Sequence, residues 1–325
     1  MKFKVVITDY LFEDMEPFLR VIRKIDADLE YNQCKTEEEV IKAAQDADVI
    51  FVHHAPITRN VIKTLKKCKL IVRPAVGFDN IDIPAAADYG IYVANVPDYC
   101  ADDVSDHAIM LILAAVKKLW LLSSNIKKGV WDFNIAKPIY RLKEKTLGLM
   151  GFGKIPQEVG RKAQCFGMKV IAYDPFIKPE FAEKANVTLV DLDTLYSTSD
   201  VISVHVPLNN QTRYMVNAEA FKKMKKTAFI VNTARGGIIN EDDLIQALQN
   251  GQIAGAALDV MEKESRIFST DHPFAKMDQV ILTPHSAWYS EESQDALLSL
   301  TAEEIVRAYN GEKPRNPVNR PGQSK

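Results

Sequence analysis

The stretch "LMGFGKIPQEVG" at residues 149–160 holds two of the three glycines of the dinucleotide-binding pattern G-x-G-x-x-G. Gly151 and Gly153 occupy the first two glycine positions, and Pro156 occupies the third. An apolar run typical of a strand precedes the loop and a helical pattern follows it, which is the context that this pattern requires. The stretch therefore predicts a phosphate-binding turn between a strand and a helix.

An acidic residue supports this interpretation. Asp174 lies 21 positions after Gly153 (174 − 153), at the end of the next predicted strand. A carboxylate there can accept hydrogen bonds from both ribose hydroxyls and would repel a 2′-phosphate, which favours NAD over NADP. The alternative is that the glycines are ordinary turn residues and Asp174 caps a strand, but strand, loop, helix and acid must then coincide by accident.

Pro156 gives a local expectation. Proline disfavours helical backbone angles at the residue before it, so we expect Ile155 to be the N-cap and Pro156 the first helical residue. The N–H groups of Lys154 and Ile155 would still face a pyrophosphate.

The pattern around the loop is an alternation of short apolar runs and helix-length segments, typical of parallel α/β sheets. Strands are predicted at 4–9, 49–54 and 69–73, and then at 145–151, 169–174, 200–206, 228–233, 254–260 and 279–284, with long helices at 101–119 and 291–311. We therefore expect an α/β protein in which a doubly wound Rossmann sheet is inserted into a smaller flavodoxin-like α/β domain. The expected substrate-binding domain is 1–99, the NAD-binding domain 100–288, and 289–325 a C-terminal helix and tail that return to the first domain.

Length and composition limit the other possibilities. A chain of 325 residues exceeds the usual size of one hydrophobic core. The net charge is −2 and no long basic run occurs, so nucleic acid and membrane surfaces are poor candidate partners. The four cysteines are far apart and pair with no nearby histidine, which predicts neither a disulfide framework nor a metal site. No apolar stretch approaches 18 residues, and the N-terminus has no secretory pattern, so a cytoplasmic location is expected.

Three polar residues follow strands of the second series. Arg235 comes after the strand at 228–233, Glu264 after 254–260, and His285 after 279–284. Ligands of open α/β sheets collect at the carboxyl ends of the strands. An arginine there can hold a carboxylate by two hydrogen bonds, and a histidine beside a carboxylate can act as a general acid or base. Taken alone, each residue type in such a place is more often a surface or loop-anchoring group, and spacing does not establish that Glu264 and His285 meet.

Seven ordered blocks resemble those of the D-2-hydroxyacid dehydrogenase family. They are the glycine loop with "VGFDNID" (76–82), "NVPDYCADDVSDHA" (95–108), "DVISVHVPLNNQT" (200–212), "VNTARGGIINEDDL" (231–244), "GAALDVMEKE" (255–264) and "TPHSAWYSEES" (283–293). Within that family, "VPDYCADDV" (96–104) and "HSAWYSEES" (285–293) look most like the subgroup related to C-terminal binding protein, a corepressor, and many bacterial relatives carry the name D-3-phosphoglycerate dehydrogenase. The resemblance implies hydride exchange between NAD and a small 2-hydroxy or 2-oxo acid in a homodimer that pairs through the helix at 101–119 and its neighbours.

The resemblance also implies roles for residues. Arg235 would bind the substrate carboxylate, and His285, oriented by Glu264, would move the proton. Substrate contacts would come from the backbone N–H groups of Val76 and Gly77, across an interdomain cleft, and from Trp288. The cofactor positions implied are Gly151, Gly153, Lys154, Ile155, Asp174, His205, Pro207, Thr233, Ala234 and Asp259, the last for the nicotinamide amide.

Three departures from the family pattern concern affinity and substrate choice. Pro156 replaces a glycine, Pro74-Ala75 stands where a bulkier residue and glycine are common, and Ser265 replaces a proline. None removes a proposed catalytic group. Two alternatives remain open: D-3-phosphoglycerate dehydrogenase as the specific activity, and a non-catalytic NAD(H)-sensing binding protein.

Overall fold

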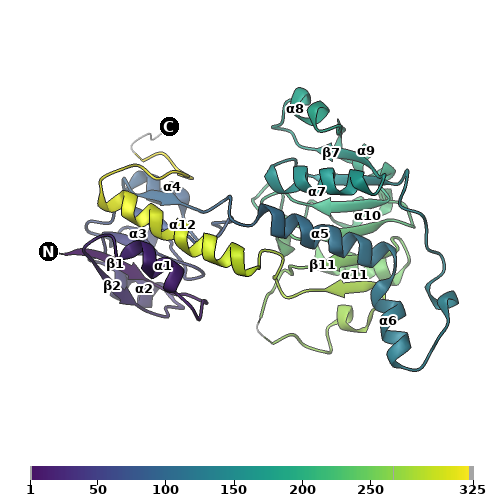
Figure 1. Ribbon diagram of the computed structural model, residues 1–325, viewed down its shortest axis with the longest axis horizontal. Coiled ribbons are helices and arrows are strands. Elements are labelled where there is room, and N and C mark those ends of the chain that lie inside the picture. Colours follow the sequence, from purple (N-terminus) through teal and green to yellow (C-terminus); the bar gives the residue numbers. More distant parts are fainter. Residues whose placement is uncertain (1, 266, 322–325) are drawn as a thin grey trace. The chain divides into compact units, whose positions relative to one another are not determined.

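The computed structural model describes residues 2–265 and 267–321. The chain divides into two compact units (Figure 1). Met1–Cys100 and Ser290–Lys325 form the first unit, and Ala101–Tyr289 form the second.

The first unit is built on five parallel strands in the order β2-β1-β3-β4-β5. The strands are β1 (Phe3–Ile7), β2 (Ala27–Tyr31), β3 (Val49–Phe51), β4 (Leu70–Val72) and β5 (Tyr92–Ala94). This is the flavodoxin-like strand order, as the sequence predicted. Every residue of β3 and β4 is buried, because helices cover both faces of the sheet.

Five helices cover this sheet: α1 (Glu16–Ile22), α2 (Glu37–Ala44), α3 (Arg59–Ile62), α4 (Ile83–Asp88) and α12 (Glu291–Tyr309). Helices α1 and α12 lie side by side although the whole of the second unit separates them in sequence (Figure 1). Beyond α12 the tail runs extended along β5, where Val318 N–H donates to the Val93 carbonyl at 2.9 Å. Asn319 also binds this strand, since its Oδ1 accepts the Val93 N–H at 2.9 Å. Residues 322–325 of the tail lie outside the described residues.

The second unit contains seven parallel strands in the order β12-β11-β10-β9-β6-β7-β8. They are β6 (Thr146–Met150), β7 (Lys169–Tyr173), β8 (Thr188–Leu189), β9 (Val201–Val204), β10 (Phe229–Asn232), β11 (Gly255–Leu258) and β12 (Val280–Leu282). The order reverses between β6 and β9, as in a doubly wound Rossmann sheet, which confirms the predicted fold class. Six of these strands were predicted. The seventh, β8, has only two residues and therefore no apolar run that the sequence could reveal.

Helices pack on both faces of the seven-stranded sheet. One face carries α5 (Ala101–Val116) and α7 (Lys154–Cys165), and the other carries α9 (Leu192–Thr198), α10 (Ala218–Lys223) and α11 (Glu241–Gln249). The remaining elements are α6 (Leu119–Lys127), α8 (Pro179–Lys184) and the 3-10 turns η1 (Phe133–Ala136), η2 (Gly236–Ile238) and η3 (Pro273–Lys276). Both cores are apolar, which leaves the polar groups concentrated at the ends of the strands.

Helix α5 ends at Val116, three residues before the predicted end, because Lys118 takes left-handed backbone angles with φ 52°. Within the described residues no single helix is long and apolar enough to cross a membrane. Helices α5 and α6 reach that length and composition only when they are taken together, and they bend by 65° at the break between them.

Candidate active site

The glycine loop joins β6 to α7. Gly151 has φ 94°, and a Cβ atom added there would lie 3.2 Å from the backbone carbonyl carbon of His205. Only glycine fits this position without strain, because both the backbone angle and the neighbouring backbone exclude a side chain. A Cβ added at Gly153 would meet no atom within 4 Å. The open space beside Gly153 is where a pyrophosphate could approach the backbone.

The predicted start of helix α7 is wrong. Gly153, not Ile155, is the N-cap, and Pro156 is the third helical residue. Proline is tolerated there because the N–H groups of the first helical turn have no carbonyl partner within the helix. The carbonyl that would face the ring of Pro156 belongs to Phe152, and the side-chain Nε2 of Gln157 binds it at 3.0 Å. The substitution of proline for glycine therefore leaves the helix start at its usual place after the second glycine.

Asp174 is the first residue after β7, and it fixes the glycine loop. Its Oδ2 accepts the N–H of Phe152 at 2.9 Å, and its Oδ1 accepts the N–H of Phe176 at 2.9 Å. A carboxylate can accept about four hydrogen bonds, so each oxygen of Asp174 can still accept a hydrogen bond from a ribose hydroxyl. Its assignment to the ribose stays a prediction.

Two of the other predicted cofactor positions follow β9 and β10 and carry unusual polar groups. The ring Nε2 of His205 lies 2.8 Å from the Ser203 hydroxyl, and burial lowers the pKa of the His205 imidazole to about 3, so the ring is neutral. The hydroxyl of Thr233 is buried and has no hydrogen-bond partner among the residues that the structure describes. Buried hydroxyls without a partner are rare in folded proteins. A polar ligand in this loop would satisfy it, and with the open space at Gly153 this supports the fit of a dinucleotide.

Arg235 lies in the same loop, and a buried asparagine shapes its backbone. Asn232, only 1% exposed, accepts the Ala234 N–H at 3.0 Å and donates to the Arg235 carbonyl at 2.9 Å. The next residue, Gly236, packs directly on the loop after β11, since an added Cβ would lie 1.9 Å from the carbonyl carbon of Met261. This contact brings the loop of Arg235 against the loop that leads to Glu264.

Glu264 and His285 meet, which the spacing in the sequence had left open. Their Oε2 and Nδ1 atoms are 2.6 Å apart, and both side chains are half-exposed. Burial would raise the pKa of the Glu264 carboxyl, but the hydrogen bond from His285 and the nearby charge of Arg235 lower it below its ordinary value. Glu264 is therefore ionised at neutral pH and holds the proton of His285 on Nδ1. The ring Nε2 has no partner among the described residues and is the atom available for proton transfer.

Two site residues were missed by the sequence prediction: His107 on α5 and Thr283 after β12. The Nε2 of His107 lies 3.0 Å from the Thr283 hydroxyl, which donates to Asp259 at 2.5 Å. Asp259, 2% exposed, also accepts the N–H groups of Ser286 and Ala287 at 3.0 and 2.9 Å. The signal that could have revealed His107 is a polar residue within an otherwise apolar stripe of α5.

Asp259 thus anchors the loop that carries His285, whose N–H donates to the Asp259 carbonyl at 2.8 Å. Burial would raise the pKa of the Asp259 carboxyl, but hydrogen bonds from His107, Thr283 and the loop N–H groups lower it, so the group is ionised. Its predicted contact with the nicotinamide amide is untested. The same holds for Pro207, for Ala234, and for Trp288, which packs edge to face on Tyr289 with ring centroids 5.6 Å apart.

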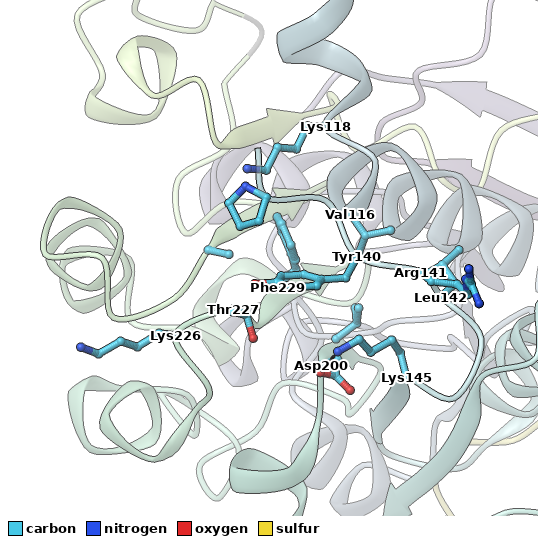
Figure 2. A pocket seen from close by; sticks show the side chains of 13 residues that line it. Val116, Lys118, Tyr140, Arg141, Leu142, Lys145, Asp200, Lys226, Thr227 and Phe229 are labelled. Carbon is cyan, nitrogen blue, oxygen red and sulfur yellow. Dashed lines mark hydrogen bonds and ion pairs between the residues drawn. The ribbon is translucent and has the colours of Figure 1, made fainter. Parts of the chain in front are cut away.

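A cavity in this unit lies at the other end of the strands. It has a volume of about 230 Å³, and its lining includes Asp200, Thr227 and Ala254, which precede β9, β10 and β11. Asp200 and Thr227 are labelled in Figure 2. The predicted site residues lie at the carboxyl ends of the same strands, so this cavity is separate from the candidate active site. No cluster of metal-ligating side chains occurs among the residues that the structure describes.

Comparisons with known proteins identify the family. Residues 109–287, more than half of the chain, match the family model described as "D-isomer specific 2-hydroxyacid dehydrogenase, NAD binding domain". The chain belongs to the D-2-hydroxyacid dehydrogenase family. Its residues 109–287 are the NAD-binding domain of that family.

Relatives and solved structures extend this match over nearly the whole chain. D-3-phosphoglycerate dehydrogenase of Methanocaldococcus jannaschii is 41% identical over 98% of this chain and 60% of its own length. Hydroxypyruvate reductase of Thermotoga maritima is 38% identical over 90% of this chain and 94% of its own. A crystal structure of D-lactate dehydrogenase from Aquifex aeolicus, complexed with NAD and lactic acid, has a TM-score of 0.87 and 29% identity over 98% of this chain and 100% of its own. The chain spans about three fifths of the length of the phosphoglycerate dehydrogenases that it matches.

Proposed function

We propose that this member of the family is an NAD-dependent dehydrogenase that interconverts a D-2-hydroxy acid and its 2-oxo acid. The observation that carries the proposal is the 2.6 Å contact between Glu264 and His285. The pair lies at the carboxyl end of an NAD-binding sheet, close enough to Arg235 for its charge to act on Glu264. A histidine held by a carboxylate, with an arginine nearby, is suited to a substrate that has a carboxylate next to a carbonyl.

Three side chains carry out the proposed reaction: Arg235, His285 and Glu264. The guanidinium of Arg235 binds the substrate carboxylate and polarises the neighbouring carbonyl. During reduction, Nε2 of His285 donates a proton to the carbonyl oxygen, and Glu264 stabilises the positive imidazolium before that transfer. During oxidation, neutral His285 accepts the hydroxyl proton. NADH, when bound, supplies the hydride, and Gly151, Gly153, Asp174 and Thr233 would hold it.

The names of the relatives narrow the choice of substrate but do not identify it. Relatives that this chain covers almost completely are named glyoxylate reductase, glycerate dehydrogenase and hydroxypyruvate reductase. We therefore propose a two- or three-carbon 2-oxo acid, with D-3-phosphoglycerate as the substrate-level alternative. A nucleotide-sensing protein without turnover, the other alternative, would need neither the Glu264–His285 pair nor Arg235.

A substrate panel tests the proposal. The purified chain is mixed with NADH and, in turn, glyoxylate, hydroxypyruvate, pyruvate and 3-phosphohydroxypyruvate, and the loss of NADH absorbance is followed. We expect turnover of at least one acid, and a preference of about tenfold or more for NADH over NADPH because Asp174 would face the 2′-phosphate. Absence of turnover with all four acids, together with nucleotide-dependent binding of a protein partner, would favour the sensor.

We also propose that the protein is a homodimer in the cytoplasm. Seven of the sixteen residues of α5 are buried, whereas no residue of the neighbouring α6 is buried. Exposed apolar side chains continue after α6, with Trp131 at 90% and Phe133 at 70% exposure. Tyr140, at the end of this segment, lies over the cavity at the beginning of the strands (Figure 2). An apolar surface of this kind is typical of an interface between copies of one chain.

Sedimentation equilibrium tests this pairing. The native chain is expected at twice its 36.5 kDa mass, and Trp131→Ser is expected to shift the equilibrium toward the monomer. The matched control is Phe176→Ser, which removes a ring of similar exposure (86%) from a different surface. A monomeric native chain would contradict the proposed dimer.

A further inference from the structure

The loop at residues 74–78 of the first unit presents two backbone N–H groups that bind no other described residue. They belong to Val76 and Gly77, the pair that the sequence prediction assigned to the substrate carboxylate. Both residues are partly buried. Consecutive N–H groups that face one way form a concave site for an anion. Hydrogen bonds to the carbonyl groups of this loop determine which way these N–H groups face.

The carbonyl groups of this loop are held from one side by the segment that follows β5. The Ala75 carbonyl accepts the N–H of Val96 at 3.0 Å, and the Val76 carbonyl accepts the side-chain Nδ2 of Asn95 at 2.6 Å. In a trans peptide the carbonyl of one residue and the N–H of the next point in opposite directions. The N–H groups of Val76 and Gly77 therefore both face away from residues 95–96.

A second buried side chain completes the support. Arg73 donates through Nη1 to the Gly77 carbonyl and through Nε to the His53 carbonyl, the latter at 2.9 Å. Arg73 and Asn95 are 8% and 7% exposed, so neither side chain reaches far into solvent. Arg73 makes further interactions and supports more than this loop. The contact of Asn95 with the Val76 carbonyl, by contrast, acts on the peptide group that carries the Gly77 N–H.

We propose that Asn95 is a positioning residue for substrate binding: its amide fixes the Val76–Gly77 peptide so that the Gly77 N–H faces the substrate carboxylate. The proposal rests on the proposed function, because it assigns the carboxylate of a 2-oxo acid to this N–H pair. Asn95 does not touch the substrate. Its loss is expected to weaken substrate binding and to leave nucleotide binding unchanged, because the nucleotide residues belong to the other unit.

The test compares Asn95→Asp with Asn80→Asp. The first variant keeps the shape of the side chain but places an acceptor oxygen against the Val76 carbonyl. The second makes the same change at a partly buried asparagine of the same unit, whose Nδ2 binds the Ala55 carbonyl at 2.9 Å. We expect Asn95→Asp to raise KM for the 2-oxo acid about tenfold or more, with a smaller change in kcat and an unchanged Kd for NADH. Asn80→Asp should change KM less than about threefold. If Asn95→Asp does not fold, Asn95→Ser is used instead, because it also removes the amide. The same rise in KM and the same unchanged Kd for NADH are then expected.

A binding readout separates this proposal from the proposed function. Oxamate, an unreactive analogue of a 2-oxo acid, is titrated into NADH-loaded protein while the backbone amide signal of Gly77 is followed by NMR. The signal should move in the native chain and move much less in Asn95→Asp. An active native chain whose KM and Gly77 response are the same in Asn95→Asp would overturn the role of Asn95 alone. A native chain without turnover would overturn the proposed function, and a Gly77 signal unmoved by oxamate would overturn the role of Asn95 whatever the activity.

Discussion

His285→Asn is expected to lower kcat by about 10²–10⁴-fold, the usual contribution of a positioned acid or base. Asparagine suits this position because His285 has φ 52°, a left-handed conformation that asparagine tolerates better than most residues. Its amide can also replace Nδ1 in the contact with Glu264. The substitution therefore removes little apart from Nε2, the proton donor. Steady-state kinetics with NADH and the best acid of the panel measures the effect.

The control for this variant is His272→Asn. His272 lies in the same unit, 3.7 Å from Glu241, and its Nδ1 caps η3 by accepting the Phe274 N–H at 3.3 Å. Asparagine is a good capping residue, so the control should keep activity within about twofold. A His285→Asn protein that binds NADH normally and retains more than about a tenth of kcat would show that His285 is not the acid.

Gly236→Ala is expected to lower the free energy of unfolding by about 2 kcal/mol or more and to reduce kcat about tenfold or more. The added Cβ would lie 1.9 Å from the Met261 carbonyl carbon and 2.4 Å from the Glu262 nitrogen, both of them backbone atoms. Relief requires the loop after β11 to move, and this loop carries Glu264. Urea denaturation measures the first effect, and steady-state kinetics measures the second.

The neighbouring Gly237→Ala is the control. A Cβ there would meet the ends of the Leu208 and Arg213 side chains at 3.3 and 3.4 Å, and these flexible groups can give way. Its expected loss of stability is below about 1 kcal/mol. Equal stability losses in the two variants would mean that the contact between Gly236 and Met261 does not fix the two loops.

The strand pattern of the second unit was predictable because parallel strands that are buried on both faces read as continuous apolar runs. The edge strand β8 was not, since two residues carry no pattern. In the first unit β2 and β5 (Tyr92–Ala94) were not predicted. The residues of β2, Ala27–Tyr31, are half-buried or exposed and include charged side chains, so they form no apolar run. In this sequence, burial on both faces of the sheet, more than strand propensity, allowed a strand to be predicted.

The glycine loop shows the limit of a local rule. The preference of a residue before proline against helical angles placed the N-cap at Ile155, but the structure places it at Gly153. The preference is small, whereas the strand, the approach of Gly151 to His205 and the Asp174 bond to Phe152 together fix the turn. Tertiary contacts decided the position of the helix start.

The candidate site was predictable in its residue types but not in its support. Arg235, Glu264 and His285 could be named because each follows a strand. That Glu264 and His285 meet, and that Asp259 and Asn95 hold the loops, depends on contacts between segments that are distant in the chain. The support from Asn232 is local, because it binds residues two and three positions further on. Asn95 and Val76 are 19 residues apart in sequence, and no spacing rule connects a side-chain amide with that carbonyl.

Deuterium transfer tests the proposed hydride exchange most directly. The best 2-oxo acid of the panel is reduced with NADH that carries deuterium at the transferred position of C4, and the product is analysed by mass spectrometry and chiral chromatography. With pyruvate or a larger acid, the proposal predicts one deuterium on C2 of the 2-hydroxy acid and the D configuration. An undeuterated product, an L product or no product with any acid would contradict it.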